Sequence, residues 1–230
     1  MLPAFTSLTL ALAALLSPAD PPRIPVDNGL VRVIRASNVP GQKSGLHKHE
    51  TNRVMIHLDQ GYMRLAFQGA SVKDVRFQAG EVRWDPADGL HTSENAGPAS
   101  YHIVEVEIKK PKGSRVRYSA QDPPKTDPKH YRVELENDQV RVLRVRYGPR
   151  DSAPVHEHAL PRITVNLTDQ AVRLTLPDGS TSDLRRAAGE IVYADTAARH
   201  SEVNLNDQPF EVVVVELKTV ASGQCLHPSS

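Results

Sequence analysis

Short apolar runs, either alternating with polar residues or rich in β-branched residues, recur along most of the chain and are bounded by Gly, Pro, Asp or Asn. Such runs are typical of β-strands, whose side chains point alternately to the two faces of a sheet. No window keeps the apolar face of a helix. The pattern predicts strands over residues 30–35, 53–58, 62–67, 81–84 and 101–108, then over 140–147, 162–167, 171–176, 190–195 and 210–217. The chain is therefore expected to be all-β.

The second half of the chain repeats the first at a constant offset of about 109 residues. Its opening segment ENDQVRVLR, from Glu136 to Arg144, resembles DNGLVRVIR from Asp27 to Arg35, and Glu107 has its counterpart in Glu216. The repeated polar residues and glycines are His47, His49, Arg53, Gly80, His91 and Asn95, which recur as His156, His158, Arg162, Gly189, His200 and Asn204. An unbroken offset means that the chain contains two copies of one module. Many short strands separated by turns predict a sandwich or barrel for each copy.

The repeat sets the expected domain boundaries. Residues 23–110 form the first module, residues 111–130 a Pro-rich connector, residues 131–219 the second module and residues 220–230 a polar tail. Pro177-Asp178-Gly179 lies between two predicted strands and is expected to form a turn.

Composition excludes some functions and leaves others open. The net charge is +1 and 24% of the residues are charged, so nucleic acid is not an expected partner. The sole cysteine, Cys225, cannot form an intramolecular disulfide. The region after the N-terminal apolar stretch is too polar for a membrane span. The sequence leaves open whether the protein is a monomer or a homo-oligomer.

An apolar stretch from Phe5 to Leu16 precedes Ser17-Pro18-Ala19. Its length suits the hydrophobic region of a signal peptide and is short for a membrane helix. Residues 1–19 are therefore expected to be a signal peptide cleaved after Ala19, and the protein to be exported to the periplasm or secreted. The first four residues contain no Lys or Arg, however, so a simple apolar leader or a misplaced start codon remains the alternative.

The histidines are the strongest chemical signal. Side chains two residues apart on a strand share a face, so the two histidines of each HxH pair can converge on one metal ion. A third histidine follows each pair at the same distance, which gives the candidate sets His47, His49, His91 and His156, His158, His200. Three imidazoles suit a divalent transition metal such as Fe, Mn, Ni, Cu or Zn and leave positions open for water or substrate. The alternative is that these histidines are only packed or hydrogen-bonded inside the module.

These motifs resemble those of the cupin superfamily. HKHETNR from His47 to Arg53, followed by Gly61, resembles the first cupin motif, and GEVRWDPADGLHTSEN from Gly80 to Asn95 resembles the second. HEHALPR (His156–Arg162) and GEIVYADTAARHSEVN (Gly189–Asn204) repeat them, with Asp195 where the family has Pro. The resemblance covers both modules and implies a bicupin, that is, two tandem jelly-roll β-barrels. It also implies three-His metal centres, which occur in dioxygenase branches of the family.

Two departures from the family pattern matter for function. The later of the two glycines of the second motif, three residues before the histidine, is replaced by Asp88 in one copy and by Ala197 in the other. The glutamate of the first motif is replaced by Arg53 and Arg162. A guanidinium about 5 Å from a divalent ion costs roughly 6–7 kcal/mol at an effective dielectric of ~20, which weakens a metal site without excluding it. Arg53 and Arg162 are therefore candidate catalytic residues that bind the carboxylate of an anionic substrate. Alternatively, each pairs with a buried glutamate, as Arg53–Glu107 and Arg162–Glu216, and replaces the metal.

Two classes of function follow. The first is an exported metal-dependent oxidoreductase, dioxygenase-like, that acts on a small anionic molecule. The second is a non-catalytic bicupin that binds a small ligand or metal, or whose sites have decayed. A fold shared by many chemistries does not choose between them.

Overall fold

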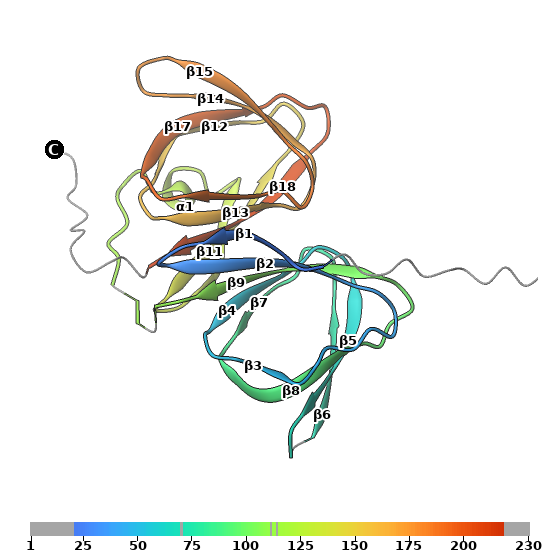
Figure 1. Cartoon of the computed structure of the whole chain (residues 1–230). Coiled ribbons are helices and arrows are strands. Elements are labelled where there is room, and N and C mark those ends of the chain that lie inside the picture. Colours follow the sequence, from blue (N-terminus) through green and yellow to red (C-terminus); the bar gives the residue numbers. More distant parts are fainter. Residues whose placement is uncertain (1–20, 70, 111, 114, 219–230) are drawn as a thin grey trace, which may run out of the picture.

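The computed structural model describes residues 21–69, 71–110, 112–113 and 115–218 and contains two β-barrels, each built from a five-stranded and a four-stranded antiparallel sheet (Figure 1). The predicted signal peptide and the polar tail lie outside these residues. The all-β expectation is confirmed. Among the described residues, no helix has the length and apolar character needed to cross a membrane.

Strands of the first barrel come from residues 23–108. Its five-stranded sheet has the order β1 (Arg23–Asp27), β2 (Val31–Asn38), β9 (Tyr101–Ile108), β4 (Arg53–His57) and β7 (Val82–Asp85). Its four-stranded sheet has the order β3 (His47–His49), β8 (Asp88–Asn95), β5 (Gly61–Phe67) and β6 (Val72–Phe77).

Strands of the second barrel repeat this arrangement. Its five-stranded sheet has the order β10 (Tyr131–Glu136), β11 (Val140–Tyr147), β18 (Phe210–Leu217), β13 (Arg162–Asn166) and β16 (Ile191–Ala194). Its four-stranded sheet has the order β12 (Ser152–His158), β17 (Ala198–Asn204), β14 (Gln170–Thr175) and β15 (Thr181–Arg186). Five pairs of strands, β2 and β11 among them, keep the 109-residue offset at both ends. The sequence repeat is therefore a structural repeat.

The two five-stranded sheets pack face to face between the barrels (Figure 1). Alternation along β9 explains how: Val104, Val106 and Ile108 are buried in the apolar layer shared with the second barrel. The intervening residues, such as Ile103, belong to the interior of the first barrel instead. A strand buried on both faces is apolar at almost every position, as β18 is.

Glycines of the second motif stand where the barrels meet. Gly80 and Gly189 adopt φ of 79° and 76°, a backbone region that only glycine enters without strain. Arg144 of the second barrel donates to the Gly80 carbonyl at 2.6 Å. Arg35 of the first barrel approaches Gly189 reciprocally, so that a Cβ at Gly189 would lie 2.7 Å from Arg35 Nη2. These glycines therefore serve the turn and the inter-barrel contact.

Asparagines of the second motif are structural. The Asn204 amide, fully buried, donates to the Gly148 and Gln208 carbonyls at 2.8 and 3.0 Å, and its oxygen accepts from Asn206 N. Asn95 makes the equivalent three bonds in the first barrel. Because every amide group is satisfied within the fold, neither asparagine is a free ligand for a substrate.

The segment expected as a Pro-rich connector also contains structure. Residues Pro123–Thr126 form a short helix, α1, which begins with two prolines. Proline is favoured at a helix start because the first amide groups of a helix have no acceptor within the helix, so the amide hydrogen that proline lacks is not needed. Asp122, just before this helix, is 4% exposed, so the connector contributes a buried carboxylate to the second barrel.

Candidate metal centres

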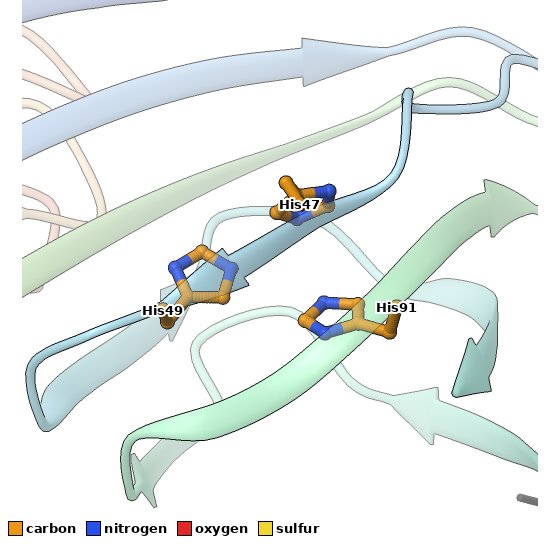
Figure 2. A group of neighbouring side chains, drawn as sticks. All are labelled: His47, His49 and His91. Atoms are coloured by element: carbon orange, nitrogen blue, oxygen red, sulfur yellow. The ribbon is translucent and has the colours of Figure 1, made fainter. Parts of the chain in front are cut away.

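The first barrel brings His47, His49 and His91 together, as the sequence predicts. β3 and β8 are antiparallel neighbours, and His47 lies directly opposite His91 in their register. The ring centroids are 4.5–5.5 Å apart, and one nitrogen from each ring lies within 4.8 Å of the others. Figure 2 shows the three rings pointing into one common space from the two strands. An ion in that space could contact all three.

The second barrel repeats this cluster in a more buried form. His156 faces His200 across β12 and β17, and the three ring centroids, including that of His158, are 4.7–5.7 Å apart. All three histidines are buried, with exposures of 0–6%. Burial lowers the pKa of His156 to about 4 and also lowers that of His158. Both imidazoles are therefore neutral near pH 7, which is the form that binds a metal.

Hydrogen bonds orient the rings for ligation. Nδ1 of His47, His91 and His156 lies 2.9–3.0 Å from a backbone carbonyl, which can only accept, so Nδ1 carries the proton and Nε2 keeps its lone pair. His49 and His158 face carboxylates instead: Glu107 lies 3.8 Å from His49 Nδ1, and Glu216 lies 3.7 Å from His158 Nδ1. The two glutamates thus occupy the second layer that usually orients metal-bound histidines.

The alternative of Arg53–Glu107 and Arg162–Glu216 pairs is not what forms. In the strand register each arginine lies beside its glutamate, yet each glutamate turns towards a different arginine. Glu216 accepts from Arg141 at 2.6 Å, and Glu107 lies 3.8 Å from Arg32.

Acidic side chains surround Arg53 in the first barrel. Its guanidinium lies 2.7 Å from Asp85 and 3.6 Å from both Asp88 and Glu105. Burial raises the pKa of Glu105 more than Arg53 lowers it. Met55 accepts a weak bond from Arg53 Nε at 3.3 Å. Arg53 is thus buried and neutralised by the protein itself.

Arg162 has a different environment in the second barrel. Asp85 and Asp88 are replaced there by Ala194 and Ala197, and Arg162 donates through Nη1 to the backbone carbonyls of Thr196 and Leu160 at 3.1 and 3.5 Å. Among the described residues, no carboxylate lies within ion-pair distance of Arg162. Burial lowers its pKa, but a guanidinium stays charged at any physiological pH. The second barrel therefore holds a cation that no protein carboxylate neutralises directly.

A cavity of about 150 Å³ lies next to Arg162. Some of its lining side chains are smaller than their counterparts in the first barrel: Thr164 corresponds to Met55, and Ala194 corresponds to Asp85. His158 and His200 also line it, so the cavity joins the guanidinium to the histidine cluster.

Two further polar residues face the second cluster and were not identified from the sequence. Glu202 accepts from His200 Nε2 at 2.8 Å, and Tyr131 donates to His156 Nε2 at 3.1 Å. Burial alone would raise the pKa of Glu202, but the His200 hydrogen bond and the neighbouring imidazoles lower it to about 2. The available signal was a break in the repeat, since Ser93 and Pro22 occupy these positions in the first copy.

Comparisons with known proteins identify the fold. No family model matches the chain, and no curated protein matches it in sequence. Among solved structures, AerE from Microcystis aeruginosa matches 86% of this chain and 98% of its own, with a TM-score of 0.60 and 13% identity. Oxalate decarboxylase from Bacillus subtilis matches 83% of this chain and 68% of its own, with a TM-score of 0.56 and 11% identity. A cupin 2 conserved barrel domain protein from Leptotrichia buccalis matches 86% of this chain and 88% of its own, with a TM-score of 0.53 and 11% identity. The chain has the fold of two tandem cupin barrels.

The donor sets of the two barrels fit a divalent transition metal. Each barrel offers three imidazole nitrogens within reach of one ion. In the second barrel, His158 Nδ1 is buried without a hydrogen-bond partner, and Glu216 lies just beyond hydrogen-bond range. A metal at Nε2 would keep the proton on Nδ1, directed at this carboxylate. The residues that would hold the metal are thus His47, His49 and His91, or His156, His158 and His200.

Proposed function

We propose that the second barrel is the functional one, and that it binds a divalent transition metal through His156, His158 and His200 and a small carboxylate through Arg162. The observation that carries this proposal is the open guanidinium of Arg162 in a cavity shared with two of the histidines. A guanidinium presents a planar fork that matches a carboxylate. A cavity of about 150 Å³ is smaller than the usual drug-sized pocket, so the ligand has only a few heavy atoms.

The proposed reaction class is that of a metal-dependent oxidoreductase, dioxygenase-like. When bound, a metal ion here would supply a Lewis acid or a site for O2. The chain's own residues would bind and orient the substrate: Arg162 holds the carboxylate, and apolar side chains such as Val212 and Val214 form the cavity wall. Mn(II) centres are described in the Bacillus subtilis oxalate decarboxylase, and Mn joins Fe, Ni, Cu and Zn as candidates for this chain.

A carboxylate-binding experiment tests the role of Arg162. Formate, acetate, oxalate and malonate are titrated calorimetrically into the metal-loaded protein. Arg162→Gln is expected to weaken binding of the preferred carboxylate by about 100-fold, because charge-assisted hydrogen bonds worth ~3 kcal/mol are lost. Arg53→Gln, the matched control in the other barrel, is expected to leave the affinity unchanged. Equal affinities of wild type and Arg162→Gln would contradict the proposal.

The alternative is a non-catalytic bicupin that holds the same metal and carboxylate without turnover. The first barrel would at most hold the metal, because acidic side chains already neutralise the charge of Arg53 that would attract a carboxylate. Oxygen consumption by the metal-loaded protein with its preferred carboxylate separates the two functions. Uptake that Arg162→Gln abolishes indicates the enzyme, whereas tight binding without uptake indicates the binding protein.

We also propose export, from the apolar stretch Phe5–Leu16 and the small residues Ser17 and Ala19. Protein isolated from its own host is expected to begin near Asp20 and to lie outside the cytoplasm. N-terminal sequencing checks this, and an intact Met1 would overturn it.

A further inference from the structure

Glu202 occupies a position that the duplication does not explain. It lies on β17, two residues after His200, so both side chains point into the second barrel. Its side chain is 13% exposed, and its counterpart in the first barrel is Ser93. A carboxylate buried in a barrel requires a compensating charge or ligand. Glu202 therefore marks a difference in chemistry between the two copies.

Its position allows it to become a neighbouring ligand. Without metal, Glu202 Oε1 accepts a hydrogen bond from His200 Nε2 at 2.8 Å, and a metal ion bound at Nε2 would displace that proton to solvent. Two donor atoms bound to one ion at about 2.1 Å, roughly at right angles, lie about 3 Å apart, and His200 has a nitrogen within 4.8 Å of those of His156 and His158. The carboxylate thus needs little movement to share an ion with the three imidazoles.

Charge favours the same role. A metal beside Arg162 would face an unneutralised guanidinium, since no carboxylate among the described residues pairs with that side chain. The negative charge of Glu202, in the same cavity, offsets the repulsion between the two cations. In the first barrel the interior glutamate is Glu105 on β9, and it lies 3.6 Å from Arg53.

We propose that Glu202 is the fourth metal ligand of the second barrel, which makes a three-His, one-Glu centre with its carboxylate on β17. Position 162 on β13 is then free to carry an arginine for the substrate carboxylate. This inference rests on the proposed metal centre and deepens it. It also makes the two barrels unequal, since Ser93 offers no carboxylate in the first.

Cobalt binding to the full chain tests the assignment. His47→Ala and His91→Ala together remove the first site, so that Co2+ reports on the second barrel alone. In that background, Glu202→Gln is expected to lower Co2+ affinity by at least about 100-fold and to change the visible absorption at saturation. Glu202→Asp, which keeps a carboxylate, is expected to retain much more of the affinity with a shifted spectrum. Arg162→Gln in the same background is the charge control: it removes a repelling cation and no ligand, so it is expected to raise the Co2+ affinity and to keep the spectrum of its parent.

Each outcome has a distinct meaning. An unchanged affinity and spectrum in Glu202→Gln would overturn the ligand role while leaving the metal centre in place. Absence of Co2+ binding in the background with Glu202 intact would overturn the metal centre itself, and the inference with it. The melting temperature of the metal-free variants shows whether they fold. If Glu202→Gln does not fold, the aspartate variant decides, because a spectrum identical to that of the parent contradicts ligation.

Discussion

Arg141→Ala is expected to lower the free energy of unfolding by about 3–5 kcal/mol. Arg141 is 3% exposed and donates to both oxygens of Asp122 at 2.6 and 2.9 Å and to Glu216 at 2.6 Å. Without the guanidinium, two buried carboxylates lose their charge partner. Burial disfavours their ionised forms strongly, so the folded state loses more than the unfolded chain. Chemical denaturation of the metal-free protein measures the change.

Arg32 provides the matched control, because it occupies the same position in the first copy. Its side chain is 41% exposed, and its nearest Glu107 oxygen lies 3.8 Å away. An ion pair that water reaches contributes little, so Arg32→Ala is expected to cost less than about 1 kcal/mol. If the two variants lost similar amounts of unfolding free energy, the conclusion that only the second barrel contains a stabilising buried charge network would be wrong.

His158→Ala is expected to lower the metal affinity of the second barrel by more than about a hundredfold, since each ligand of a protein site contributes roughly 3 kcal/mol. His158 is buried, and Glu216 stands behind its Nδ1. Competition with a chelator of known affinity measures the loss, in protein whose first site has been removed by His47→Ala and His91→Ala.

His57 tests whether any buried histidine would have the same effect. It is 2% exposed, stacks on Phe77 at 4.0 Å and lies outside both clusters. His57→Ala, made in otherwise wild-type protein, is expected to lower stability and to leave the number of bound metal ions unchanged. A loss of metal in this variant would show that metal binding reports general folding damage and not ligation.

Repetition made the fold and the histidine clusters predictable. A constant offset fixes which residues correspond, and strand alternation fixes which side chains share a face. His47 and His91 therefore meet across two strands, as do His156 and His200. The predicted strand ranges leave out β1, β3, β6, β8, β10, β12, β15 and β17. In β8 and β17 the apolar alternation is weak because polar side chains such as His91, Asn95 and Glu202 face inward.

Partners of the arginines could not be predicted, because strand register does not decide between neighbours. Arg53 lies between Glu107 on one side and Asp85 on the other, and it turns to Asp85. Glu107 lies instead 3.8 Å from both Arg32 on the next strand and His49. Only packed side chains determine such a choice.

Residues that break the repeat were missed for a different reason. The repeat identifies only residues that both copies share. Glu202 and Glu105 each occur in one copy only. Asp122 was missed because it lies in a Pro-rich segment that resembles a simple connector, although its carboxylate is buried against Arg141. Differences between the copies therefore carry the proposed difference in function.

Metal analysis of the full chain, purified without added metal or chelator, tests the central claim most directly. The account predicts at least one equivalent of a divalent transition metal, Fe, Mn, Ni, Cu or Zn, in the wild type. It predicts that His156→Ala with His200→Ala removes the equivalent bound by the second barrel while the chain stays folded. A fully folded, metal-free wild type, or a metal content that this double variant leaves unchanged, would contradict it.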